Sequence, residues 1–574
     1  AIKRAFFRLY CVKPLYGKSM ATSSSPLNIA ASRTLQAVRA AGGGGGGVLP
    51  ASYQLSAGNF SARKVDPILI YPRPDVETAA WTKHRRHYPG IGYRVPIGVS
   101  FGSGPLVYEL IAGPSGASIG EFLVVSGDTL IPNEEYGVLT WANPTTGNHP
   151  FHVRVSFQDG FAPVDVYWTL EVTTTGTIFI DAVSGSDSTG NGTLGNPFQT
   201  INAWHLNDLT DTTYSEFQVC YRGGVHNVSA NNTATGVNAG SWRLNGTDKP
   251  LVHYPYTGET VEFDMSNTTI VMGIGTVYTG QTGSDCYFGK IKYSGGLNAT
   301  DNPKHFAIND AHSPTVYAAG GAAQRMTWDT PHHIGLIPEA VTTNNCGAMF
   351  SPIAGTGRKR HFFYAHRPTF ENCYPGPTSD NGLEFNGYYL STTVNVLVDH
   401  VTCINTDFGY SPIITKGGGT FWCVRFLDSV QAPLQQFTTW PLGSYDLSIA
   451  GPFELSYAKI LNRKTGTTTA AFTSNVNFGL IDGQNPDHKP EYLVRSTLSR
   501  EPVTGRAALR ARDWPLEIDG ILGVADNFAY SGNTWATGFV GYTVANNPLD
   551  ANLNLTGQAR TDQLGLFGAE IKAE

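Results

Sequence analysis

Charged residues are scarce in this 574-residue chain, where Asp, Glu, Lys and Arg together make up 15% of the sequence. Helical bundles use many Glu and Lys residues on their exposed faces, so this composition argues against them. No apolar run approaches the length of a membrane span, and the net charge of -6 gives no overall basic field. We therefore expect no membrane segment and no nucleic-acid partner.

Cysteine pairs of the CxxC type are also lacking, although the chain has 7 cysteines. A metal knuckle or redox couple is therefore not expected, and the thiols are predicted to be mostly buried. The histidines at His332-His333, and His361 with His366, have no carboxylate at a recognised ligand spacing. We expect neither a bound metal nor a cofactor.

Acidic residues are missing from the start of the chain, where the first is Asp66 and the preceding residues are basic and rich in Ser, Ala and Gly. The apolar stretch Ala5 to Val12 is interrupted by Arg8 and is shorter than a signal-peptide core, which argues against secretion by that route. A helix is predicted over residues 27–40, followed by a flexible joint at Gly42 to Gly47. Residues 1–90 are interpreted as a basic docking arm.

Glycine and aromatic residues, in contrast, are plentiful, with 65 Gly, 27 Tyr and 29 Phe. Together with short alternating apolar patterns, this predicts an all-β protein. The strands expected first are Leu106 to Leu110, Glu121 to Val125, Gly137 to Trp141, Phe151 to Phe157 and Val166 to Val172. The turn Gly113-Pro114-Ser115-Gly116 and the strand Tyr136 to Trp141 resemble those of immunoglobulin-like domains in surface and phage structural proteins. Residues 91–174 are therefore interpreted as an immunoglobulin-like β-sandwich without chemistry of its own.

The remaining residues, 175–574, open with an ordered set of short motifs: Phe179-Ile180-Asp181, Gly185-Ser186-Asp187, Asn196-Pro197-Phe198, Tyr221-Arg222-Gly223-Gly224 and Asn245-Gly246-Thr247. This series resembles the start of the right-handed parallel β-helix proteins that include pectate-lyase-like, chondroitinase-B-like and alginate-lyase-like enzymes. The segments Leu555 to Arg560 and Gly565 to Glu570 resemble the closing strand of the same group. The resemblance implies a β-helix over most of the chain.

Internal copies support a repeating architecture. Four segments align with one another: Pro368 to Asn372, Val401 to Asn405, Val424 to Asp428 and Ala458 to Asn462. Each ends on Asn or Asp, and equivalent residues of a parallel solenoid stack about 4.8 Å apart, so these side chains are expected to form a ladder at a turn. Loops of varying length between the copies are where a groove would be built.

Candidate catalytic residues are the carboxylates Asp380, Glu384 and Asp407, with Phe408, Tyr410 and Trp422 as candidate sugar-binding aromatics. Neighbouring turns of a solenoid could bring two carboxyl groups to the roughly 5 to 9.5 Å separation that glycoside hydrolysis uses, while aromatic rings stack on the sugars. The alternative is that the Asp and Asn residues here only form turns and ladders.

A lyase mechanism is less well supported. Phe370-Glu371-Asn372-Cys373 followed by Glu384 resembles the chondroitinase-like branch, which implies a lysine base. However, residues Phe385 to Tyr389 contain no lysine, and the nearest candidate is Lys416. No catalytic lysine or calcium site is carried over.

A basic arm, a spacer and a β-helix without a signal peptide resemble a phage tailspike or head fibre, which leaves the cell by lysis. The resemblance implies a location on the virion surface, attachment to other virion proteins through the arm, and binding of a bacterial surface glycan. It also implies a homo-oligomer, since such spikes are commonly trimers. Whether the protein is an enzyme is left open between a polysaccharide depolymerase and a binder.

Two other functions remain open. The first is a non-catalytic structural or decoration component of the virion, for which the predicted β-helix is only a rigid surface. The second is a secreted polysaccharide lyase or hydrolase, which would require an export signal.

Overall fold

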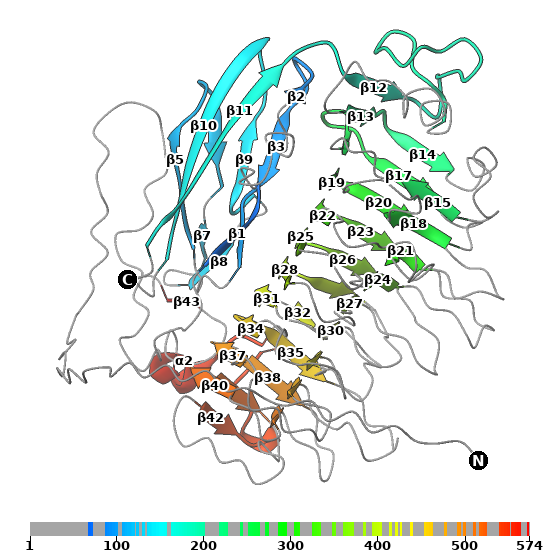
Figure 1. The fold of residues 1–574 in the computed structure, drawn as a ribbon. Helices are drawn as coiled ribbons and strands as arrows, with labels where there is room; N and C mark the ends of the chain where they lie inside the picture. The colour runs from blue at the N-terminus through cyan, green and yellow to red at the C-terminus, as the bar shows by residue number, and fades with distance from the viewer. Residues whose placement is uncertain are drawn as a thin grey trace, which may run out of the picture.

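A computed structural model gives the fold of the chain (Figure 1). The structure describes residues 67–72, 86–100, 106–120, 122–125, 129–132, 135–157, 162–200, 217–227, 241–244, 251–264, 270–274, 285–294, 304–309, 324–334, 347–351, 360–371, 383–385, 393–404, 413–415, 419–422, 425–426, 437–439, 453–462, 476–478, 491–494, 497–500, 509–511, 516–519, 521–524, 539–550, 553–563 and 571–572. The predicted helix at 27–40 and the glycine joint lie outside these residues. Strands dominate the described residues, which confirms the all-β prediction at the level of secondary structure.

Three long parallel sheets, here together called the parallel coil, take up most of the described chain. The first sheet contains β12 (Thr177–Ile180), β13 (Phe217–Tyr221), β16 (Leu251–Pro255), β19 (Asp285–Gly289), β22 (Gln324–Asp329), β25 (Arg360–His366), β28 (Thr393–Asp399), β31 (Gly419–Trp422), β34 (Phe453–Ser456), β37 (Glu491–Val494) and β40 (Leu516–Asp519). The second sheet contains β14 (Gly224–Asn227), β17 (Val261–Asp264), β20 (Ile291–Ser294), β23 (His332–Ile334), β26 (Thr369–Glu371), β29 (Thr402–Ile404), β32 (Arg425–Phe426), β35 (Lys459–Asn462), β38 (Thr497–Arg500), β41 (Ile521–Val524) and β42 (Phe539–Tyr542). The third sheet contains β15 (Ser241–Leu244), β18 (Ile270–Ile274), β21 (Lys304–Asn309), β24 (Gly347–Ser351), β27 (Leu383–Phe385), β30 (Ile413–Thr415), β33 (Phe437–Thr439), β36 (Val476–Phe478) and β39 (Leu509–Ala511).

The order of the strands shows how the chain winds. From β13 to β41 it passes through the first, second and third sheets in turn, and each strand pairs in parallel with the equivalent strand of the next turn. The four aligned sequence copies fall on β26, β29, β32 and β35, which are consecutive neighbours in the second sheet. Phe370 pairs with Cys403, Cys403 with Phe426, and Phe426 with Ile460, which confirms the predicted alignment residue by residue.

A tight turn joins several first-sheet strands to the second-sheet strands that follow them. The residue after the first-sheet strand has a positive φ on four successive turns, at Lys290, Thr330, Arg367 and His400, and again two turns later at Tyr457. This conformation is unfavourable for residues other than glycine. A backbone hydrogen bond supports it in the first four: each donates its N–H, at 2.7 to 2.9 Å, to the carbonyl of the residue that ends the first-sheet strand one turn later. The repeated turn therefore brings the ends of the first-sheet strands into a row.

Side chains of the first sheet alternate between two environments. Phe288, Trp328 and Val398 are buried at equivalent positions of β19, β22 and β28, within the coil. Their neighbours Tyr287, Tyr364 and Leu397 point the other way and belong to a second core, shared with the N-terminal residues described next. Both faces of this sheet are therefore covered.

The N-terminal module, as we name it, supplies that second cover. It contains β1 (Ile68–Tyr71) with β4 (Gly98–Ser100), a sheet of β2 (Arg86–His87), β11 (Val164–Val172), β10 (Gly147–Ser156) and β5 (Val107–Ala112), a sheet of β3 (Tyr93–Pro96), β9 (Val138–Trp141) and β6 (Ala117–Ile119), and the hairpin of β7 (Phe122–Val125) and β8 (Thr129–Pro132). All five strands predicted here from the sequence are present, with ends shifted by a few residues. β1 and β2 lie in the segment interpreted as the arm, so the module begins before residue 91.

The module packs along the parallel coil and is not a free spacer (Figure 1). β1 and β4 contact β25 and β28 of the first sheet. A Cβ on Gly98 would lie 2.6 Å from Tyr364 Cε1 and 2.9 Å from Leu397 Cδ2, so only glycine permits this approach. The tight fit fixes the module against the outward face of the first sheet.

The C-terminal segment differs in part from the prediction of a closing strand on the coil, and Gly565 to Glu570 lie outside the described residues. Residues Leu555 to Arg560 instead lead into the helix α2 (Gly557–Gln563), after a short 3-10 helix at Val544–Asn546. The last strand, β43 (Ile571–Lys572), pairs with β8 of the N-terminal module. No helix in the described part of the chain is long and apolar enough to cross a membrane.

Candidate functional site

Ionisable side chains gather where the N-terminal module covers the first sheet. Asp329, His366, Asp399, Trp422 and Ser456 end successive first-sheet strands and pair with one another in register. We call these five residues the buried polar row, because none of them is more than 6% exposed. Burying polar and charged groups is costly unless they are paired, so the partners of each group indicate what the row can do.

Asp329 is paired with a residue of the N-terminal module. Arg94 Nε and Nη2 donate to its two carboxylate oxygens at 2.5 and 3.0 Å, and Tyr287 donates its hydroxyl at 2.8 Å. Burial opposes ionisation of Asp329, but the charge and hydrogen bonds of Arg94 hold its pKa well below the usual range. The pair is a buried ion pair that joins the module to the coil. Arg94 also forms an ion pair with Glu135.

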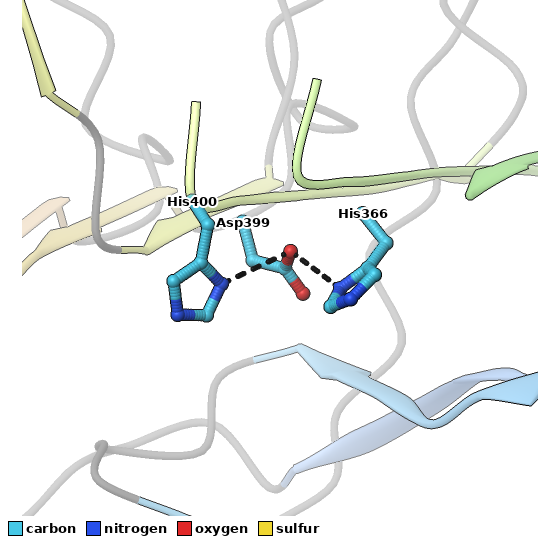
Figure 2. A group of neighbouring side chains, drawn as sticks. All are labelled: His366, Asp399 and His400. Atoms are coloured by element: carbon cyan, nitrogen blue, oxygen red, sulfur yellow. Dashed lines mark ion pairs between the residues drawn. The ribbon is translucent and has the colours of Figure 1, made fainter. Parts of the chain in front are cut away.

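Asp399 lies between two histidines (Figure 2). His366 Nδ1 is 2.8 Å and His400 Nδ1 is 3.3 Å from the same oxygen, Oδ1. The other oxygen, Oδ2, accepts a hydrogen bond from the Tyr364 hydroxyl at 2.8 Å, and the backbone N–H of Arg367 donates to Oδ1 at 3.1 Å. Burial opposes ionisation of Asp399, but His366 and His400 hold its pKa well below the usual range.

The three groups form a donor set for a cation. His366, Asp399 and His400 are all buried, and each offers one ligand atom within 4.8 Å of the others. Burial lowers the pKa of His400 to about 4, although Asp399 opposes this shift, so its imidazole is neutral at neutral pH. Neutral imidazole and carboxylate are the forms in which these side chains bind transition metals.

The module limits what the buried polar row can do. The ring of Tyr136, from the module, lies 5.4 Å from the ring of Trp422 and 6.0 Å from that of His400. Figure 2 shows the His366, Asp399 and His400 side chains pointing from the coil toward the blue strands of the module. In this arrangement the row holds two parts of the protein together and does not line an open groove.

The six residues predicted to form a site are only partly covered by the structure. Asp380, Asp407, Phe408 and Tyr410 lie outside the described residues. Glu384 lies in β27 of the third sheet, where it pairs with Met349 and Ile414.

Trp422 is placed differently from the expectation. It ends β31 in the first sheet, is only 5% exposed, and packs at 4.7 Å between ring centroids against His400. A sugar could stack on this ring only if the module moved away. The reason is the docking of the module, which the sequence did not predict.

The sequence nevertheless contains a signal for the buried polar row. Extending the four aligned copies by two residues toward the N-terminus places His366, Asp399, Trp422 and Ser456 in one column. Asp329 occupies the same position one turn earlier. Ligand spacing within a single segment could not reveal this set, because its members come from different turns.

Comparisons of the chain with protein-family models, curated proteins and solved structures found no match.

Proposed function

We propose that the chain is a right-handed parallel β-helix protein with an immunoglobulin-like N-terminal module, and that it binds an extended bacterial surface polysaccharide from a phage virion. The long parallel stacking of its sheets is the observation that carries this proposal. Within the described part of the chain, the first and second sheets each contain 11 strands. At about 4.8 Å between strands, such a sheet extends roughly 50 Å, which suits a polymer of repeating units better than a small ligand.

The covered first sheet narrows the binding surface. Because the N-terminal module occupies its outward face, the polymer must use the second or third sheet or the loops beside them. Glu384 lies in the third sheet, whereas in the sequence Asp380 falls between β26 and β27 and Asp407 between β29 and β30. All three candidate carboxylates thus belong to the third sheet or to segments that enter it on consecutive turns.

Attachment to a particle is proposed from the sequence alone. The basic residues that precede Asp66 in the predicted arm, together with the glycine joint, would dock on other virion proteins, and the protein would act as a homo-oligomer. Size-exclusion chromatography with light scattering tests this part. A trimer supports the spike arrangement, whereas a monomer at all concentrations opposes it.

A non-catalytic surface component is the second candidate function. It is favoured by the buried polar row, where Asp329 and Asp399 serve the joint between module and coil instead of an open groove. In this case the protein would bind or decorate without cleaving glycan.

Binding and cleavage assays separate the two functions. Purified protein is incubated with bacterial capsule, O-antigen and alginate-type polysaccharides, and binding, chain length and the absorbance of unsaturated products are followed. Asp380→Ala, Glu384→Ala and Asp407→Ala are compared with Glu109→Ala, which changes an exposed carboxylate of the N-terminal module.

We expect binding to at least one polymer. Cleavage that is lost in one of the three variants but kept in Glu109→Ala would show a depolymerase and locate its acid or base. Binding without cleavage would favour the second candidate, and no binding across the panel would contradict the proposed function.

A further inference from the structure

The geometry around Asp399 points to a metal site in the joint between module and coil. We propose that His366, Asp399 and His400 bind one divalent transition metal ion, with Zn²⁺ as the best fit. This proposal is independent of whether the protein binds glycan.

The distances between the ligand atoms are close to those of a metal site. Ligands at 2.0 to 2.1 Å from Zn²⁺ lie about 2.9 to 3.4 Å from each other for angles between octahedral and tetrahedral. Asp399 Oδ1 is 2.8 Å from His366 Nδ1 and 3.3 Å from His400 Nδ1. All three ligand atoms lie within 4.8 Å of one another, so one ion can reach them once the two imidazoles shift toward each other.

Hydrogen bonding carries the second part. Among the described residues, neither Nδ1 nor Nε2 of His400 has a hydrogen-bond partner, although the residue is buried. His400 Nδ1 and Asp399 Oδ1 form an ion pair at 3.3 Å whose geometry is not that of a well-formed hydrogen bond. Buried polar atoms are normally satisfied, and coordination of an ion would satisfy this nitrogen.

The surroundings of Asp399 provide a second shell. Tyr364 donates its hydroxyl to Oδ2 and also lies 3.2 Å from His366 Nδ1. This bond orients the carboxylate so that Oδ1 faces the two imidazoles. Second-shell bonds of this kind fix the ligands of metal sites.

The donor set and its burial indicate the ion and its role. Two imidazoles and one carboxylate suit Zn²⁺ and neighbouring transition metals better than Ca²⁺ or Mg²⁺, which prefer oxygen ligands. Because His366, Asp399 and His400 are at most 8% exposed beneath the module, the ion would be structural and would exchange slowly.

Metal analysis tests the proposal directly. The full chain, freed of any histidine tag, is produced with Zn²⁺ in the medium, and elemental mass spectrometry measures Zn, Fe, Co, Ni and Mn per chain. After unfolding and refolding, Co²⁺ is titrated into the protein and its visible absorption spectrum is recorded. We expect about one ion per chain and a Co²⁺ spectrum with nitrogen and oxygen ligands.

Variants locate the site. His400→Ala should abolish the tightly held ion, and Tyr364→Phe should weaken affinity by about 10- to 100-fold because it removes only the second-shell bond. The matched control is His332→Ala, which breaks a His–carboxylate pair with Glu371 on the second sheet, at 2.8 Å. It should keep the ion.

Circular dichroism checks that each variant is folded. Metal uptake by the refolded wild-type chain tests the proposal without any substitution. Failure of that chain to take up Zn²⁺ or Co²⁺, or equal uptake by His400→Ala and His332→Ala, would overturn the proposal. The cluster would then be a His–Asp–His hydrogen-bonded network only.

Discussion

Arg94 of the N-terminal module donates two hydrogen bonds to Asp329 of β22, a residue 235 positions later in the sequence. Asp329 is fully buried, so this pair fixes where the module sits on the first sheet. The carboxylate would be left uncompensated without the guanidinium.

Removing the guanidinium tests this relationship. Arg94→Met should lower the free energy of unfolding by about 3 to 5 kcal/mol, because one charge of a buried pair then lacks its partner. Urea denaturation followed by tryptophan fluorescence measures the change. The control is Arg154→Met, which breaks the more exposed pair with Asp165 and should leave stability nearly unchanged. Equal effects of the two variants would show that the Arg94–Asp329 pair does not hold the module on the first sheet.

Acid should destabilise the protein well before its carboxylates are protonated. Burial lowers the pKa of His87 to about 4 and that of His253 to about 3. Between these values and the unfolded pKa of about 6.5, the unfolded chain binds protons that the folded chain does not, so stability is highest above pH 6.5 and falls as the pH falls.

The free energy of unfolding should fall by up to about 3 kcal/mol for each pH unit of acidification, counting the two histidines together. Urea denaturation at a series of pH values from neutral to about 4.5 measures this dependence. His253→Phe should lower the number of protons taken up on unfolding by about one, and the slope with it. A stability that is flat over this range would contradict the burial of these imidazoles.

Gly98 should tolerate no side chain. Gly98→Ala places a methyl group 2.6 Å from the ring of Tyr364, and such overpacking costs about 1 to 3 kcal/mol. Thermal melting and limited proteolysis of the module measure the loss. In Gly195→Ala, the control, the new Cβ meets nothing within 4 Å. If both variants melt like the wild type, the close approach of β4 to the coil is incorrect.

The C-terminal strand should protect the hairpin of the N-terminal module. Ile571 pairs with Leu130 and Lys572 with Thr129, so deleting residues 569–574 exposes one edge of β8. Hydrogen exchange followed by mass spectrometry should show faster exchange in β8 and unchanged exchange in β10 and β11. Unchanged exchange in β8 would mean that β43 does not pair with β8.

Local patterns in the sequence predicted the local structure well. Alternating apolar residues located the strands of the module, and the copies at Phe370, Cys403, Phe426 and Ile460 predicted the register of the second sheet. Both signals arise from neighbouring residues or from repetition, and a single sequence contains both.

Contacts between distant segments were not predictable in the same way. Nothing near Arg94 indicates that it meets Asp329, and Trp422 reads as an exposed aromatic until the module covers it. His366 and Asp399 meet only because two turns of unequal loop length end in register. The helix α2 takes up Gly557 to Arg560 of the expected closing segments, because a resemblance in a few residues does not determine the local conformation.

The coil is proposed to present a long surface to a polymer, and a series of ligands of increasing length tests this proposal. A polysaccharide that binds in the panel is fragmented, and oligosaccharides of increasing size are titrated calorimetrically into the wild-type chain. The affinity should rise with ligand length until the oligosaccharide approaches roughly 50 Å, the length of an eleven-stranded parallel sheet. A single repeating unit that binds as tightly as the polymer would contradict the claim.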